Sequence, residues 1–439
     1  MKRLNSILFM VVLVVMTGLS WFVLFKNQAV KSSEYDKCIR MARRNMEKQI
    51  YVDAVANYQQ ALELTPKDYN LEMELAQAYY LWGNEEGFVS ACNAAMDIDA
   101  TNSYAYLELA RYYENLQQYH AALKVVKSAD KVTDRQEIEQ LFYNLKNKIV
   151  TKGIGAKQIT AWRKIGAVNY CAFLYEDKWG MLRSDANHSI RAQYEYIGVY
   201  DDVSGLIPVC FNGEYYYIDA NANRKLVGDY DYEFLGSFGD GYAPAQRDGK
   251  YGYINIGFEE KNFEYDFAGS FVNGVAAVKQ GEKWGLINKD LKMITEIKYD
   301  DILIDGNGFC SMYGTIVAVE NGKYVFLDTE GKRTCEQQFD KAKMAASNNG
   351  AIAVQVGENW GFADIKGNMI IEAKYADADS FSLGLAAVKT TSNWGYIDMD
   401  EKMVIPDNYR EAKPFNSNGS AMVQIGDIWD MIVLCEYSD

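Results

Sequence analysis

The sequence predicts a multidomain chain of the α+β class, with an N-terminal transmembrane helix, α-helical hairpins and a long all-β repeat domain. Three observations predict this: an uncharged run at residues 7–25, a 34-residue period within 35–134, and an aromatic residue about every 35 positions after residue 153. At 439 residues the chain is too long for one ordinary core. We expect a membrane anchor at 1–33, helical repeats at 34–152 and a β-repeat domain at 153–439.

The composition is that of a folded protein, with 49% hydrophobic and 24% charged residues. The 33 Tyr, 34 Gly and only 5 Pro suit short strands joined by tight turns. A net charge of -15 argues against a nucleic-acid partner, because phosphate binding needs a surplus of Lys and Arg. Seven scattered cysteines without a C-x-x-C pair form neither a disulfide framework nor a zinc site.

The N-terminal run has the length of a membrane span. Lys2 and Arg3 precede it, and its 19 residues reach from Ile7 to Phe25, about 28 Å as a helix. A cleaved signal peptide is the alternative, but residues 26–31 offer no small-x-small cleavage site. We therefore expect an uncleaved, single-pass anchor in the cell membrane.

The short basic tail before this span favours an extracytoplasmic body, because basic flanks stay inside. Five basic residues after the span weaken the asymmetry: Lys31, Lys37, Arg40, Arg43 and Arg44.

Small and aromatic residues repeat with helical spacing in the second segment. Leu75, Ala76 and Tyr79 in one unit match Leu109, Ala110 and Tyr113 in the next. The second helices carry similar positions: Ala54, Tyr58 and Ala61; Phe88, Cys92 and Ala95; Ala122, Val126 and Ala129. The pattern resembles the tetratricopeptide repeat, although the first unit departs from it with Met41, Ala42 and Asn45. Residues 135–150 read as a capping helix.

This resemblance implies a concave face that binds peptides or proteins. The alternative is that three units serve only as a spacer or a dimerisation surface.

Three sets of markers define the β repeats. The aromatic anchors are Trp179, Tyr215, Tyr251, Trp284, Tyr324, Trp360, Trp394 and Trp429. A glycine follows five of them, at Gly180, Gly252, Gly285, Gly361 and Gly395. Another glycine lies ten residues before seven of them, at Gly205, Gly241, Gly274, Gly314, Gly350, Gly384 and Gly419. One offset kept through seven units indicates a real structural repeat.

Each unit reads as short strands separated by turns. In the seventh unit we expect strands at 385–389, at 394–398 and from residue 403, with residues 409–415 crossing to the next unit. The array resembles the WG β-repeat family of bacteria over about 280 residues. Tyr216, Val325 and Asp430 depart from it by replacing the second glycine.

Neighbouring units of such an array must cover one another's faces. We expect a propeller-like ring, with an open β-solenoid as the alternative. The last unit stops soon after Trp429 and the first has an atypical start at 152–168, which fits closure by complementary strands but also simple fraying of the two ends. One large ring per unit is what a repeated core needs, so we interpret the anchors as packing residues rather than a ligand platform.

No residue pattern supports an enzyme. The two histidines, His120 and His188, lie in different domains, and the sequence gives no catalytic, cofactor-binding or metal site. Asp305 to Gly308 form an acidic loop that we interpret as a solvated turn rather than a cation site.

We therefore expect a membrane-anchored, non-enzymatic scaffold at the bacterial cell surface that binds a protein partner. The alternative is a cell-wall or carbohydrate-binding module that recognises glycan.

Overall fold

The computed structural model describes residues 31–225, 231–348 and 350–437. The chain forms two compact units, one ending at Lys146 and the other beginning at Asn147. The expected span at 7–25 lies outside the described residues, and no helix within them is long and apolar enough to cross a membrane. The expected domain boundary between residues 152 and 153 falls inside strand β1 (Ile149–Ala156).

The first unit consists of antiparallel helical hairpins. After a helix that includes residues 31–47, its helices are α2 (Tyr51–Leu64), α3 (Tyr69–Trp82), α4 (Glu85–Ile98), α5 (Tyr104–Asn115), α6 (Tyr119–Ser128) and α7 (Gln136–Lys146). Asp68 and Asn84 accept hydrogen bonds from the first turns of α3 and α4, which satisfies backbone donors that the helix leaves unpaired. The expected capping helix corresponds to α7, which is shorter because the chain enters β1 at Ile149.

Small residues let the helices of this unit approach closely. Ala54, Ala61, Ala76 and Ala95 are buried in its core. A Cβ added to Gly87 on α4 would lie 2.3 Å from the Tyr79 ring on α3, so this position requires glycine.

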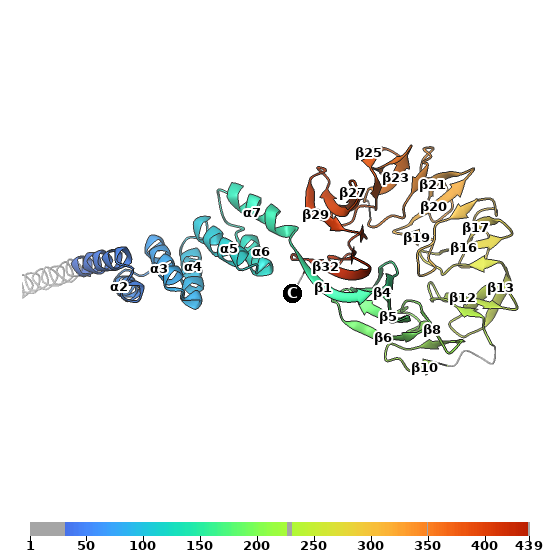
Figure 1. Ribbon diagram of the computed structural model, residues 1–439, viewed down its shortest axis with the longest axis horizontal. Helices are drawn as coiled ribbons and strands as arrows, with labels where there is room; N and C mark the ends of the chain where they lie inside the picture. The colour runs from blue at the N-terminus through green and yellow to red at the C-terminus, as the bar shows by residue number, and fades with distance from the viewer. Residues whose placement is uncertain (1–30, 226–230, 349, 438–439) are drawn as a thin grey trace, which may run out of the picture. The chain divides into compact units, whose positions relative to one another are not determined.

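The second unit is a closed ring of sheets (Figure 1). In the described residues the strands form eight sheets, which we call blades 1 to 8. Blade 1 contains β2 (Gln158–Ile159), β3 (Arg163–Ile165), β4 (Val168–Tyr175), β5 (Lys178–Arg183) and β6 (His188–Tyr194), and blade 2 contains β7 (Tyr196–Ile197), β8 (Ile207–Phe211), β9 (Glu214–Ile218) and β10 (Arg224–Lys225). Blade 3 contains β11 (Phe234–Leu235), β12 (Tyr242–Arg247), β13 (Lys250–Asn255) and β14 (Glu260–Tyr265), and blade 4 contains β15 (Phe267–Ala268), β16 (Val275–Gln280) and β17 (Lys283–Asn288).

Blade 5 contains β18 (Asp301–Ile302), β19 (Ser311–Met312), β20 (Thr315–Glu320) and β21 (Lys323–Leu327), and blade 6 contains β22 (Lys341–Ala342), β23 (Ile352–Val356), β24 (Asn359–Ala363) and β25 (Met369–Tyr375). Blade 7 contains β26 (Asp377–Ala378), β27 (Leu385–Lys389), β28 (Trp394–Asp398) and β29 (Met403–Tyr409), and blade 8 contains β30 (Glu411–Ala412), β31 (Ser420–Ile425), β32 (Ile428–Leu434) and β1. Each blade begins with a two-residue strand, which we call its inner strand.

The N-terminal strand of the unit closes the ring. β1 pairs antiparallel with β32, with Ile149 opposite Leu434 and Ala156 opposite Trp429. The last blade thus takes its outer strand from the start of the unit. The predicted propeller-like ring is confirmed, and the open-solenoid alternative is wrong.

The two sets of marker glycines have separate physical roles. The glycines ten residues before the anchors turn the chain into the second strand, and all but Gly350 adopt positive φ, which costs other residues energy. The glycine after the anchor lies under a bulge of the neighbouring strand. A Cβ on Gly361 would lie 2.6 Å from the Ile371 carbonyl oxygen, and one on Gly395 would lie 2.7 Å from that of Ile405. The pairing register shifts at both places.

The three units that lack this glycine differ from one another in their outer strands. In the unit of Tyr216, the described residues of the outer strand β10 pair with residues 217 and 218. Next to Val325 the described pairing is reduced to isolated bridges, but so is that next to Gly285, so this feature does not depend on the glycine. Asp430 faces the bulge of β1 and its carboxylate accepts hydrogen bonds from the backbone N–H groups of Ile154, at 2.7 Å, and Gly155, at 2.9 Å. The Asp430 side chain therefore helps to hold the closing strand.

Successive blades are also joined by a repeated ionic clamp. Asp266 accepts from Lys250 of blade 3, at 2.6 Å, and from the Gly281 N–H in the hairpin turn of blade 4, at 2.7 Å. Asp300 and Asp340 repeat the arrangement at the next two junctions. These bonds to the ionised form lower the pKa of all three carboxyl groups, with the lysine as the largest cause.

Candidate functional site

The aromatic anchors lie at the junctions between blades. Trp360, Trp394 and Trp429 are buried, at 6–7% exposure, and the other five are half-buried. From blade 2 to blade 4 they alternate with the first residues of the inner strands in a continuous chain of rings, Tyr196, Tyr215, Phe234, Tyr251, Phe267 and Trp284, whose successive centroids are 5.4–5.9 Å apart. Such tilted contacts stabilise packing. The three buried tryptophans present no free face to a ligand.

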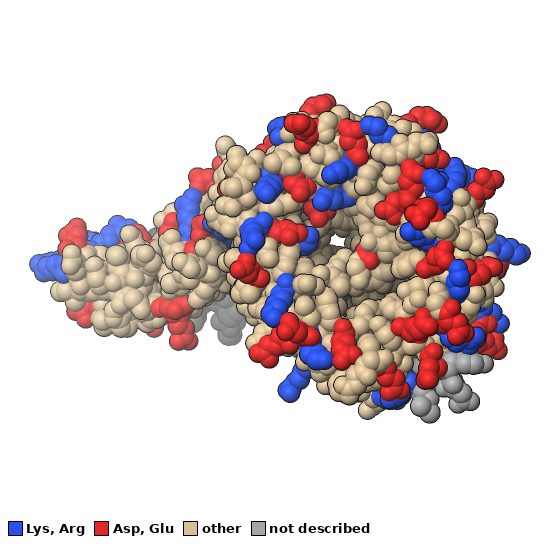
Figure 2. Space-filling model, turned by 45° about the vertical axis from the view of Figure 1, so that its right-hand side comes forward, with Lys and Arg blue, Asp and Glu red and all other residues tan. Residues whose placement is uncertain are grey.

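The centre of the ring contains the cavity that we consider the candidate ligand site. Its volume is about 420 Å³, and Figure 2 shows the hollow from one face of the ring. The residues that follow the inner strands of blades 1, 5, 6, 7 and 8 line it. Acidic and basic side chains are interspersed over the surrounding surface.

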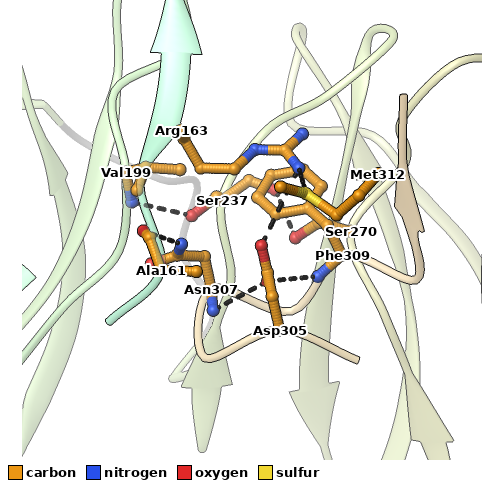
Figure 3. A network of polar contacts seen from close by, with 9 residues as sticks. All are labelled: Ala161, Arg163, Val199, Ser237, Ser270, Asp305, Asn307, Phe309 and Met312. Carbon is orange, nitrogen blue, oxygen red and sulfur yellow. Dashed lines mark hydrogen bonds and ion pairs between the residues drawn. The ribbon is translucent and has the colours of Figure 1, made fainter. Parts of the chain in front are cut away.

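A segment of blade 1 crosses the ring to reach blade 5. Asn307 donates a hydrogen bond to the Ala161 carbonyl oxygen at 3.0 Å, and the Arg163 guanidinium lies 3.7 Å from the centroid of the Phe309 ring (Figure 3). Arg163 also pairs with Asp305 at 3.8 Å, with both side chains largely buried. The contacts link residues about 150 positions apart, so they hold the ring across its diameter.

Burial dominates the electrostatics of this pair. It raises the pKa of Asp305 and lowers that of Arg163, while their mutual attraction opposes both shifts. One Asp305 oxygen accepts from the backbone N–H groups of Asn307 and Phe309, at 2.9 Å each, whereas its Oδ2 has no hydrogen-bond partner.

The prediction of a solvated turn at residues 305–308 is wrong for two of its residues. The Asp305 side chain is only 3% exposed and Asn307 is buried. The cause is the crossing segment of blade 1, which covers the loop from the opposite side of the ring. Sequence spacing within one blade gives no sign of such a contact.

Three charged side chains follow inner strands on one side of the cavity. Lys343, Asp379 and Lys413 come directly after β22, β26 and β30. Burial raises the pKa of Asp379, and the two lysines oppose the shift. Sequence reasoning missed these residues. An alignment of the units could have found them, because the same position is glycine in blades 2, 3 and 4, as Gly198, Gly236 and Gly269, and charged in blades 6, 7 and 8.

The described residues hold no group of three or more His, Cys, Asp or Glu side chains placed to bind a metal ion. The histidines lie in different units, with His120 on α6 and His188 in β6. All seven cysteines are free thiols, and burial raises the pKa of Cys92 and Cys310 to about 12, which makes these thiols poor nucleophiles at neutral pH.

The helical unit carries a second candidate site, an aromatic face built from α3, α4 and α5. Tyr80 and Trp82 end α3 with exposed side chains, at 53% and 43%. The Tyr80 ring lies 5.7 Å from that of Phe88 and 6.1 Å from that of Tyr112, and Trp82 stacks on Tyr79. These rings form two groups, Tyr80 with Phe88 and Tyr112, and Tyr79 with Trp82, and no described ring contact joins them. We call the five residues together the aromatic face.

Acidic side chains border this face. Glu72 and Glu85 both act on the pKa of its tyrosines, raising those of Tyr79 and Tyr112 after the larger effect of burial. Exposed aromatic side chains such as Tyr80 and Trp82 are typical of an interaction surface.

One family model matches parts of the ring unit. The family model described as a WG containing repeat matches residues 220–251, 262–284, 284–324, 360–393 and 394–429, so the ring unit contains WG repeats. No curated protein sequence matches the chain.

Among solved structures, the helical unit has tetratricopeptide-repeat neighbours. The TPR2B-domain:pHsp70-complex of yeast Sti1 is 21% identical and covers 26% of this chain and 96% of its own, with a TM-score of 0.23. The Sgt2 TPR domain from Aspergillus fumigatus is also 21% identical and covers 26% of this chain and 77% of its own, with a TM-score of 0.22.

A further solved structure matches a longer part of the chain. Kluyveromyces lactis Hsv2 is 9% identical and covers 52% of this chain and 90% of its own, with a TM-score of 0.32.

Proposed function

We propose that this chain is a non-enzymatic scaffold whose helical unit binds a protein partner through the aromatic face. The observation that carries the proposal is the exposure of Tyr80 and Trp82 beside packed Tyr79, Phe88 and Tyr112. Packing by the neighbouring rings positions the two exposed side chains before binding, which lowers the entropy cost of association. Aromatic anchors of this kind supply most of the binding energy in many interfaces.

The charges around the face define the chemistry of the partner. Glu72 and Glu85 lie close enough to influence the tyrosines, so a partner that buries the face meets negative charge at its border. A segment with a large apolar side chain next to Lys or Arg satisfies both features, since a cation also binds well over Tyr and Trp rings.

The test is affinity purification of the full-length chain from the cells that produce it, compared with a Tyr80→Ala/Trp82→Ala double variant. The proposal expects a co-purifying protein that is lost, or reduced about tenfold or more, with the variant. Lys124→Ala on α6 serves as the matched control, because it is exposed on the same unit outside the aromatic face. Equal recovery with the double variant and the control contradicts the proposal.

We further propose that residues 7–25 anchor the chain in the cell membrane with its body outside. The support is the length and apolarity of that segment in the sequence. A cysteine at Val203, which is 72% exposed on the ring, provides the test in a Cys335→Ser background, since the other six cysteines are buried. Labelling of Val203→Cys by a membrane-impermeant maleimide in intact cells is expected. Labelling only after lysis contradicts this topology.

A further inference from the structure

The cavity at the ring centre is asymmetric. After the inner strands of blades 2, 3 and 4 the chain has glycine, and an added Cβ would lie 2.5 Å from the Pro208 side chain at Gly198 and 2.5 Å from the Pro244 side chain at Gly236. The corresponding positions of blades 6, 7 and 8 carry Lys343, Asp379 and Lys413. One side of the ring is therefore closed by tight packing, and the other contributes long polar side chains to a cavity of about 420 Å³. This volume lies in the range of small-molecule sites.

Buried polar atoms without a hydrogen-bond partner line this cavity, although Asp305 Oδ2 has an ion-pair contact with Arg163. Trp162 Nε1, Asn416 Nδ2 and Asp305 Oδ2 have no hydrogen-bond partner among the protein atoms. Both Trp162 and Asn416 are more than nine-tenths buried. The Asn416 Oδ1 already accepts from the N–H groups of Asn418 and Ser420, at 2.9 and 3.1 Å, which leaves Nδ2 as the free donor. Folding buries such groups at a cost unless something pairs with them.

The charges exclude a simple anion or a simple cation as the best occupant. Lys343 and Lys413 already pair with Asp377 and Glu411, so the lysines give the cavity no surplus of positive charge. Asp305 is paired with Arg163, and Asp379 adds a further carboxyl group. A cation would suit Asp379 but would leave the donors of Trp162 and Asn416 unpaired. A ligand that carries both a positive and a negative group can pair with Asp379 and with the donors of Trp162 and Asn416.

The rest of the wall is apolar. Met312, Met422 and Phe415 contribute to it, and most of the exposed lining is carbon. Methionine side chains adapt to apolar ligands of different shape. The ligand therefore has an apolar body as well as two charged ends.

We propose that the ring centre binds a small zwitterion of the α-amino acid class with a large apolar side chain. Its carboxylate accepts from Trp162 and Asn416, its ammonium donates to Asp379, and its side chain packs on the methionine and Phe415 wall. This site is independent of the protein-binding function proposed for the helical unit.

The test is calorimetric titration of the full chain with L-phenylalanine. Three probes change one feature each: N-acetyl-L-phenylalanine lacks the ammonium, L-phenylalaninamide lacks the carboxylate, and glycine lacks the apolar side chain. L-Phenylalanine is expected to bind with a Kd below about 1 mM, and each of the other probes about tenfold or more weakly. Asp379→Asn is expected to weaken L-phenylalanine about tenfold but to leave the weak affinity for the N-acetyl compound nearly unchanged.

Two further variants keep the result interpretable. Asp400→Asn in an exposed turn is the matched control and is expected to bind as the wild type does. Leu303→Trp fills the cavity with a larger side chain and is expected to abolish binding of L-phenylalanine. This variant tests the site independently if Asp379→Asn does not fold. If none of the probes binds at concentrations up to about 10 mM, the ring centre is a water-filled channel only and the proposal is overturned, since useful small-molecule sites have a lower Kd. Equal affinity for the probes, or full binding by Leu303→Trp, also overturns it.

Discussion

Removing the Asp430 carboxylate is expected to weaken closure of the ring. In Asp430→Ala the N–H groups of Ile154 and Gly155 lose their shared acceptor at a half-buried position. An uncompensated backbone donor costs about 1–3 kcal/mol when fully buried, and half-burial places each near the lower end. The expected loss is about 2–3 kcal/mol in the free energy of unfolding. For a unit of this size that lowers Tm by roughly 4–10 °C.

The assay is thermal unfolding of the full chain followed by tryptophan fluorescence, together with hydrogen exchange of the β1 amides. Asp430→Asn retains a side-chain oxygen that can accept both bonds, so it is expected to lose less than half as much as Asp430→Ala. Asp427→Ala is the control, because its exposed pair with Arg410 contributes little. Unchanged exchange in β1 and a Tm equal to that of Asp427→Ala would refute the role assigned to Asp430.

Three other predictions test separate parts of the structure. Gly361→Ala is expected to destabilise the ring by about 2–3 kcal/mol in chemical unfolding, because its Cβ collides with the Ile371 carbonyl, whereas Gly153→Ala meets no atom and is expected to be nearly neutral. Asp340→Asn removes a carboxylate whose folded pKa is lowered. Its Tm deficit relative to wild type is therefore expected in full above about pH 4 and is lost as the pH falls from there through the lowered folded pKa, whereas a deficit independent of pH contradicts the clamp. Tyr80→Ala is expected to leave Tm almost unchanged while reducing partner recovery about tenfold, which separates binding from stability.

The strands could be predicted from the sequence because their markers are local. The expected strands at 385–389 and 394–398 coincide with β27 and β28, and β29 begins at residue 403 as expected. Alternating apolar residues and turn glycines fix such short elements within one unit. Closure by complementary ends was an expectation that the sequence left open, since both ends of the array lack a piece that a ring supplies but the same ends also fit simple fraying.

The ring centre could not be predicted in the same way. Its residues come from blades far apart in the chain, and the contact of Arg163 with Asp305 depends on how the whole ring closes. Burial of Asp305 therefore contradicts an expectation based on its local loop sequence. The aromatic face was missed for a related reason: Tyr80 and Trp82 lie on one helix, but Tyr112 contacts Tyr80 only through packing of the next hairpin.

The most direct test of the proposed scaffold is site-specific photo-cross-linking in the cells that produce the protein. A benzoyl-phenylalanine at Tyr80 preserves an aromatic ring on the proposed face, and the same group at Lys124 samples another exposed surface of that unit. The account predicts one discrete protein adduct from position 80 and none of the same mass from position 124. No adduct from position 80, or the same adduct from both positions, would contradict it.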